Sequence, residues 1–147
     1  MNKNNIYRII DANLNRAREG IRVAEEVARL YFDDAKLSSQ LKSLRHQLTR
    51  VAKKNFDEKK LLSFRDSQKD VGADSMGGLE KKRADLESIV QANLRRSQEA
   101  VRVLEEFGKL TKLKIPPKAG EQSAQSFKRI RFKLYVLEQK MMELSKT

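Results

Sequence analysis

The chain repeats one helical segment, and this repeat limits the folds it can adopt. The segment IIDANLNRAREGIRVAEEVARL, residues 9–30, recurs as IVQANLRRSQEAVRVLEEFGKL, residues 89–110, with 11 of 22 positions identical. Its apolar residues recur every three or four positions, which is typical of an amphipathic helix. A further match aligns QLKSLRHQL at 40–48 with SFKRIRFKL at 126–134. We therefore expect an all-α fold, a four-helix bundle built from a duplicated antiparallel helical hairpin.

The expected domain is single and covers residues 1–147, since a chain of this length can build one core but not two. The first copy of the repeat spans 7–55 and the second spans 87–144. The connecting segment 56–78 lacks a sustained period, and we expect a functional loop there between the halves, after a short helix around 59–64. The periodicity predicts long helices over about 9–30, 37–55, 79–113 and 123–144.

The composition points to an anionic partner. The chain has 32 Lys and Arg against 20 Asp and Glu, a net charge of +12, which suits nucleic acid, a phosphorylated metabolite or an anionic membrane surface. It has no Cys, which excludes disulfides and thiolate chemistry. No apolar run is long enough to span a bilayer, and the N-terminal MNKNNIYRII lacks the apolar core of a signal peptide. We therefore expect a cytoplasmic protein. No P-loop, Rossmann or zinc-protease motif is present.

Polar residues lie within the predicted buried face of the repeated helix. At about 100° per residue, Asn13 and Arg16 fall inside the apolar arc, and Asn93 and Arg96 occupy the equivalent positions. Burying an amide or a guanidinium is costly unless it finds partners. One interpretation is a buried network that only fixes the pairing of the helices. The symmetric recurrence of both residues favours another interpretation, a polar pocket between the helices that holds an anionic ligand.

The predicted bundle would bring these side chains together near its pseudo-twofold axis. Arg45 and Arg131, from the two other helices, are expected to approach the same centre. Guanidinium groups bind phosphate oxygens through paired hydrogen bonds, and amides recognise ring nitrogens or carbonyls. Carboxylates one turn further on, Glu19 and Glu99, can hold Mg²⁺ or an exocyclic amine. Four other residues are predicted to project outward as solvated pairs: Arg22, Glu25, Arg102 and Glu105.

The connecting segment carries its own ligand-binding chemistry. Arg65 and Lys69 are suited to phosphate, and Asp66 and Asp70 are suited to Mg²⁺. Their spacing matches no metal motif, and an Asp in a loop often only builds a turn. Both interpretations of the aspartates stay open.

The chain resembles a known family over essentially its whole length. The strings that carry the resemblance are RIIDANLNRAREGIRVAEEVARL, LRHQL, FRDSQKDVG and QANLRRSQEAVRVLEEFGKL, followed by FKRIRFKLYVLE. The family is the helical hydroxymethylpyrimidine-phosphate kinase family of thiamine biosynthesis. The resemblance implies transfer of the ATP γ-phosphoryl group to 4-amino-5-hydroxymethyl-2-methylpyrimidine phosphate, with Mg²⁺ as cofactor. It also implies thiamine phosphate synthase as a partner, because this module often precedes the synthase in one polypeptide. No (β/α)₈ sequence follows Thr147, so synthase activity itself is not expected.

On this hypothesis the candidate site residues take three roles. The predicted catalytic residues are Arg16, Arg96, Glu19 and Glu99. Binding of the pyrimidine phosphate and the nucleotide is assigned to Asn13, Asn93, Arg45, Arg131, Arg65 and Lys128. Metal binding is assigned to Asp66 and Asp70.

Two other classes of function stay open. A basic helical nucleic-acid-binding protein would gather Lys and Arg on one exposed face, whereas here both signs of charge are mixed along every helix. A non-catalytic module associated with thiamine-phosphate synthase would use the polar residues only to pair the helices. The sequence leaves open the phosphoryl donor, the half that binds the acceptor, and whether two copies form a homodimer.

Overall fold

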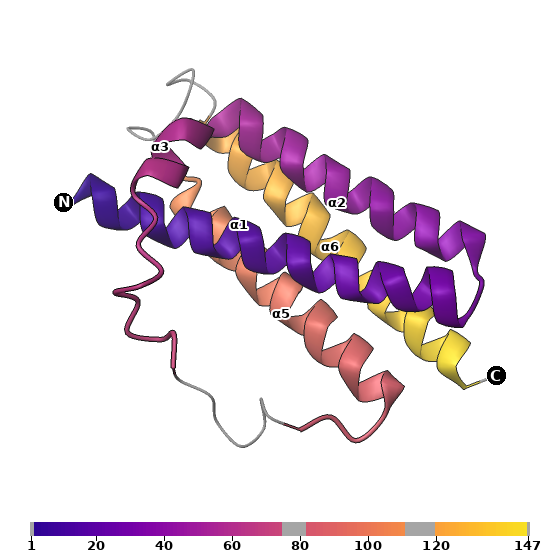
Figure 1. Ribbon diagram of the computed structural model, residues 1–147. Helices are drawn as coiled ribbons and strands as arrows, with labels where there is room; N and C mark the ends of the chain where they lie inside the picture. Colours follow the sequence, from indigo (N-terminus) through magenta and orange to yellow (C-terminus); the bar gives the residue numbers. More distant parts are fainter. Residues whose placement is uncertain (1, 75–81, 111–119, 147) are drawn as a thin grey trace.

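The computed structural model describes residues 2–74, 82–110 and 120–146. These stretches contain four long helices, whose arrangement can be followed in Figure 1. They are α1 (Lys3–Glu26), α2 (Ala35–Asn55), α5 (Leu86–Phe107) and α6 (Gly120–Ser145), with a π-helical turn η1 (Val27–Tyr31) after α1 and a short helix α3 (Glu58–Ser63). No strand occurs in these three stretches. The prediction of an all-α bundle is confirmed.

Each of four helices begins at a side chain that caps its free backbone N–H groups. The Asn2 carboxamide oxygen accepts from the Asn4 N–H of α1, and Asp34 accepts from the Leu37 N–H of α2 at 2.8 Å. Asp57 caps α3 in the same way, and Asp85 caps α5. A cap of this kind stabilises a helix by about 1 kcal/mol. It also fixes where each helix starts.

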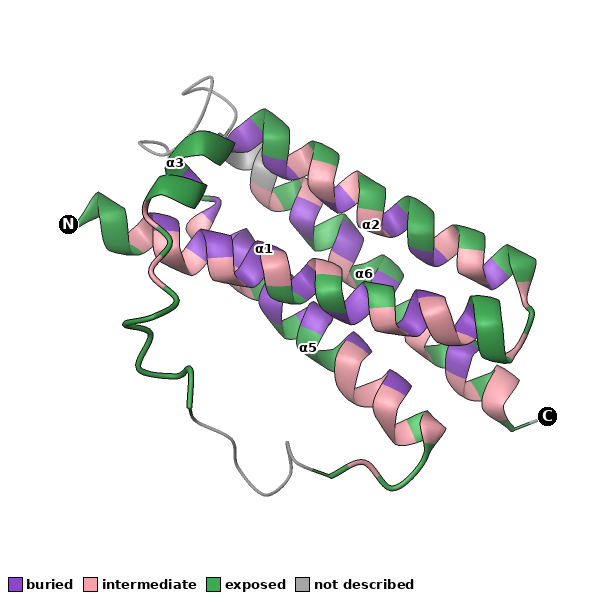
Figure 2. Ribbon diagram, viewed as in Figure 1, coloured by how far each residue is buried: buried purple, intermediate pink, exposed green. Residues whose placement is uncertain are grey.

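The four long helices form a ring in which α1 contacts α2 and α5, and α6 contacts the same two helices. Figure 1 shows that neighbours in this ring run in opposite directions. Their buried faces meet in one core, which Figure 2 shows as the inward-facing purple segments. The fully buried large side chains include Ile10, Leu41, Leu94, Leu104 and Phe127. This core positions α1 and α5 side by side.

α1 and α5 approach each other closely at Gly20. A Cβ on this residue would lie 2.1 Å from Ser97 Oγ and 2.5 Å from the Asn93 carbonyl oxygen. At the same crossing, Ser97 Oγ donates a hydrogen bond to the Ala17 carbonyl at 2.9 Å. Ala17 and Ser97 are equivalent positions in the two copies of the repeat. The two repeated helices therefore cross at matching points of their sequences.

Both predicted ends of the third helix need correction within the described residues. The third helix was expected from residue 79, but α5 begins at Leu86, because residues 82–84 are not helical and Asp85 is the cap. Its helical part ends at Phe107. The predicted extensions over 79–81 and 111–113 lie outside the described residues. The short helix expected around 59–64 is confirmed as α3.

Candidate functional site

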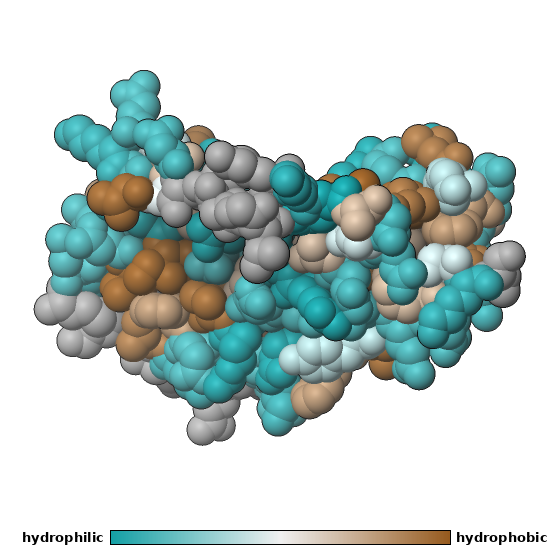
Figure 3. Space-filling model, turned by 90° about the horizontal axis from the view of Figure 1, so that it is seen from below, coloured by the Kyte–Doolittle hydropathy of each residue, from teal (hydrophilic) through white to brown (hydrophobic). Residues whose placement is uncertain are grey.

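Two adjoining pockets lie along α1. The first, called here the α1 pocket, has a volume of about 590 Å³ and is bounded by α1 and by residues 65–70 of the segment after α3. The second, the α1/α5 pocket, has a volume of about 540 Å³ and lies between the two repeated helices. Asn13 and Arg16 line both pockets. Figure 3 shows the side of the molecule on which α5 lies, and hydrophilic residues cover most of its middle. Both volumes fall in the range of small-molecule sites.

The pockets contain most of the residues predicted for the site. The α1 pocket is lined by Asn13, Arg16, Glu19, Arg65, Asp66 and Asp70, together with Arg8, which the sequence analysis did not single out. The α1/α5 pocket is lined by Asn13, Arg16, Arg96 and Glu99. Four predicted residues line neither pocket: Asn93, Arg45, Arg131 and Lys128. Asn93 lies on α5 at the helix crossing, where its carbonyl faces Gly20.

Arg16 and Arg96 are exposed, so the prediction that they are buried was wrong. The buried stripe of α1 consists of Ile10, Leu14, Ala17, Ile21 and Ala24. Arg16 lies roughly 120° around the helix from the centre of that stripe. Within the described part of the chain, neither guanidinium makes a hydrogen bond or an ion pair. Both side chains line the α1/α5 pocket with their charge uncompensated.

Asn13 is buried as predicted, and its equivalent Asn93 is half-buried. Each side-chain nitrogen donates a hydrogen bond of 2.8 Å to the backbone carbonyl four residues earlier, at Ile9 and at Ile89. This contact holds both carboxamides in the same orientation in the two copies. The carboxamide oxygens accept nothing from the described residues, so the Asn13 oxygen is available to a ligand in either pocket.

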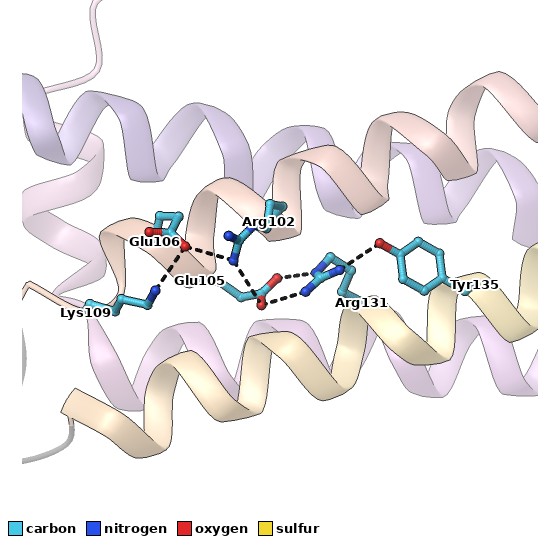
Figure 4. A network of polar contacts seen from close by, with 6 residues as sticks. All are labelled: Arg102, Glu105, Glu106, Lys109, Arg131 and Tyr135. Atoms are coloured by element: carbon cyan, nitrogen blue, oxygen red, sulfur yellow. Dashed lines mark hydrogen bonds and ion pairs between the residues drawn. The ribbon is translucent and has the colours of Figure 1, made fainter.

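Arg45 and Arg131 form ion pairs instead of joining the other arginines, which corrects the predicted cluster. Arg45 donates to both carboxylate oxygens of Glu25, at 2.8 and 3.2 Å. Arg131 makes the equivalent two bonds to Glu105 and a third, of 2.8 Å, to the Tyr135 hydroxyl. Figure 4 shows this group between α5 and α6. The Arg45–Glu25 pair joins α2 to α1, and the Arg131–Glu105 pair joins α6 to α5. Each pair therefore stabilises the packing of one hairpin.

Glu25 and Glu105 are buried, with 4% and 3% of their surface exposed, so the prediction that they are solvated was wrong. Burial alone would raise the pKa of Glu25. The hydrogen bond and positive charge of Arg45 outweigh that effect, and the pKa lies below its ordinary value. The pKa of Arg131 is raised, chiefly by its hydrogen bond to Glu105. Arg22 and Arg102 reach these carboxylates from the solvent side, each at 3.6 Å.

Arg65 is held by Asp11, a residue that the sequence analysis missed. Arg65 Nε and Nη2 lie 2.7 Å from the two carboxylate oxygens of Asp11, and this hydrogen bond raises the pKa of Arg65. Beside the pair, the rings of Tyr7 and Phe64 stack with centroids 5.5 Å apart. These contacts fix the start of the 65–74 segment against α1. Arg65 therefore positions the segment, and its charge is already compensated.

The aspartates of that segment fit Mg²⁺ only as partners of a phosphate ligand. Asp66 accepts from the Lys69 N–H at 3.2 Å and Asp70 from the Gly72 N–H at 2.8 Å, so both also build turns. Among the residues that the structure describes, no group of three acidic or histidine side chains could hold a metal ion by itself. Mg²⁺ in phosphoryl-transfer sites uses one or two carboxylates plus phosphates and water. Asp66 and Asp70 line one pocket and meet that requirement.

Lys128 lies apart from both pockets. It is exposed on α6, and its ammonium group lies 5.8 Å from the centre of the Phe132 ring. Nothing in this position brings Lys128 to the ligand-binding surface of α1 and α5. No helix in the described stretches is long and apolar enough to cross a membrane.

These features define a class of protein, a helical bundle with arginine-lined pockets between repeated helices. The sequence matches the ThiD2 family over residues 8–140, and the chain belongs to this family. Its expected membership in a helical family linked to thiamine biosynthesis is thereby confirmed.

Relatives support the same family link. The chain is 38% identical over 137 residues to a thiamine-phosphate synthase of Nostoc punctiforme, covering 93% of this chain and 35% of the relative. It is 39% identical over 144 residues to one of Rhodopirellula baltica, covering 95% of this chain and 36% of the relative. The chain thus spans about a third of the length of these relatives. No solved structure matches it.

Proposed function

We propose that this protein is a kinase of thiamine biosynthesis that phosphorylates 4-amino-5-hydroxymethyl-2-methylpyrimidine phosphate to the diphosphate, with ATP as donor. One observation carries the proposal. Arg16 and Arg96, equivalent residues of the two copies, line one pocket and have no partner within the described chain. Two uncompensated guanidinium groups at one pocket favour a phosphorylated ligand.

The reaction suits a site with many cations and no histidine. The acceptor is a phosphate monoester that is largely dianionic near neutral pH, so no strong base is needed to deprotonate it. One of its oxygens attacks the γ-phosphorus of ATP while the bond from that phosphorus to the β,γ-bridging oxygen breaks. The products are the pyrimidine diphosphate and ADP, and no proton has to move when the acceptor is dianionic.

The main barrier to this reaction is the repulsion between two polyanions. Arg16 and Arg96 would lower it by holding phosphate oxygens at fixed positions. Asn13, whose amide is oriented by Ile9, would orient the bound ligand. When bound, Mg²⁺ would supply further neutralisation of the phosphates, and Asp66 and Asp70 would hold it.

The direct test is detection of the product by ³¹P nuclear magnetic resonance. The purified protein is mixed with the pyrimidine phosphate, ATP and Mg²⁺. The proposal predicts that the monoester resonance is replaced by the coupled resonances of a diphosphate while ADP appears in equal amount. Loss of ATP without diphosphate formation, or no change with a folded protein, would refute it.

The names of the relatives favour a second candidate, a non-catalytic module that assists thiamine-phosphate synthase. In this role the protein would raise the activity of the synthase without consuming ATP. Adding the protein to a thiamine-phosphate synthase supplied with ready-made pyrimidine diphosphate separates the candidates. Only the second candidate predicts faster formation of thiamine phosphate under that condition.

A further inference from the structure

The two pockets are related by the internal repeat. Each is lined by the same three residues of one copy: Ala12, Arg16 and Glu19 in the α1 pocket, and Ala92, Arg96 and Glu99 in the α1/α5 pocket. The repeated helix therefore presents one set of side chains twice. What differs between the pockets is the rest of their lining, and this difference can distinguish two phosphorylated ligands.

The α1 pocket has an excess of carboxylates. Apart from the neutral pair of Arg65 and Asp11, the charged residues of the described chain that line it are Arg8, Arg16, Glu19, Asp66 and Asp70. Three carboxylates against two arginines repel a free polyanion. The same set accepts a polyanion that arrives with a divalent cation, because carboxylates ligate the cation. A magnesium complex of a nucleoside triphosphate has this property.

The α1/α5 pocket has the opposite balance. Among the described residues and leaving out Arg83, which donates to the Lys82 carbonyl at 3.0 Å, its charged lining consists of two arginines and one carboxylate: Arg16, Arg96 and Glu99. Ala92, Ala100 and Val103 add small apolar surfaces on the α5 side. This lining suits a monophosphate on a small, methylated heterocycle without a metal ion, and Glu99 supplies an acceptor for an exocyclic amino group.

We propose that the α1/α5 pocket binds the pyrimidine monophosphate and that the α1 pocket binds the magnesium nucleotide. This inference rests on the proposed function, which does not itself divide the substrates between the pockets. Arg16 and Asn13 line both pockets, so the γ-phosphate and the acceptor phosphate meet at these two residues. Arg16 then contacts both reactants, whereas Arg8 contacts only the nucleotide and Arg96 only the acceptor.

Isothermal titration of three variants tests this division. Arg8→Gln, Arg16→Gln and Arg96→Gln are each titrated with the pyrimidine monophosphate without Mg²⁺, and separately with a non-hydrolysable ATP analogue and Mg²⁺. Arg96→Gln should weaken binding of the monophosphate by about tenfold and leave the affinity for the nucleotide within about twofold of the wild-type value. Arg8→Gln should do the reverse, and Arg16→Gln should weaken both. Arg95→Gln, the same change at an exposed neighbour outside both pockets, is the matched control.

The outcomes separate this inference from the proposed function. Suppose that the wild type makes the diphosphate, but Arg96→Gln weakens binding of the nucleotide and Arg8→Gln weakens binding of the monophosphate. The assignment of the two ligands to the pockets is then wrong, while the proposed kinase activity is still supported. The division is also wrong if all three variants weaken both ligands equally. If the wild type binds neither ligand, both proposals fail together. Circular dichroism of each variant verifies that it is folded.

Discussion

Arg65 forms a two-point ion pair with Asp11, with both nitrogen–oxygen distances at 2.7 Å, and so ties the segment after α3 to the middle of α1. The two residues are 54 positions apart. Asp11 is buried, whereas Arg65 is partly exposed. The pair holds the start of the segment that carries Asp66 and Asp70, and so it restricts where these aspartates lie relative to Arg16.

Breaking this pair should loosen the segment more than it destabilises the bundle. For Asp11→Asn we expect a loss of only about 1 kcal/mol in the free energy of unfolding, since solvent screens Arg65. Hydrogen exchange of residues 64–74 should become at least several-fold faster. Glu138→Gln, which breaks the exposed pair with Arg95, serves as the control and should leave exchange in this segment unchanged. Unchanged exchange in Asp11→Asn would show that other contacts hold the segment.

Removing the buried carboxylate of Glu105 should destabilise the second hairpin strongly. Glu105→Gln leaves Arg131 without its counter-charge between α5 and α6, and we expect a loss of roughly 2–4 kcal/mol in the free energy of unfolding, measured with urea. The neighbouring Glu106, changed to Gln, is the control: it loses only exposed ion pairs with Arg102 and Lys109, so its unfolding midpoint should shift far less than that of Glu105→Gln. Equal midpoints for the two variants would contradict the structural role given to the Arg131–Glu105 pair.

The equivalent pair in the first hairpin should produce an acid-dependent loss of stability. Because the pKa of Glu25 is lowered in the folded state, its ionised form contributes stability that is present above the unfolded-state pKa of about 4.3 and is lost as pH falls through the folded-state pKa. The difference in unfolding free energy between wild type and Glu25→Gln should therefore be constant near neutral pH and shrink below about pH 4. A difference that does not change down to pH 3 would contradict the lowered pKa.

The crossing of α1 and α5 should not tolerate a larger residue. In Gly20→Ala the added methyl group would overlap Ser97 Oγ and the backbone of Asn93. Forcing the helices apart should cost about 1–3 kcal/mol in the free energy of unfolding. Gly72→Ala, in the exposed segment after α3, is the control, because its methyl group would meet only the end of the Asp70 side chain, with Oδ1 at 3.3 Å. If Gly20→Ala melts at the wild-type temperature, the helices are not as close as the structure places them.

The repeat predicted the architecture because helical periodicity and capping residues are local signals. The periodicity over about 37–55 predicted α2, which the structure places at Ala35–Asn55. The ion pairs were not predictable in this way. The burial of Glu25 was missed because the predicted arc was centred near Ile9. Measured from Ile10, Glu25 lies about 60° around the helix, inside the buried face, and its distant partner Arg45 compensates its charge.

The candidate site was predicted in part for the same reason. The predicted arc was centred near Ile9, which is only half-buried, and this wrong centre placed Arg16 inside the core. Both Ile9 and Ile10 are apolar, and the local pattern does not determine which of them faces the other helices. Arg8 was missed because a single arginine near a helix start carries no signal. Its position is understood only from the pocket that the distant segment completes.

The central claim is that Arg16 and its equivalent Arg96 hold the phosphates between which a phosphoryl group is transferred. The decisive measurement is kcat/KM for diphosphate formation by Arg16→Gln, compared with the neighbouring control Arg95→Gln. We predict that Arg16→Gln lowers kcat/KM by about 10²–10³-fold, as expected for loss of a group that stabilises charge in the transition state. The control should keep the wild-type rate. A folded Arg16→Gln variant with wild-type kcat/KM would contradict the account.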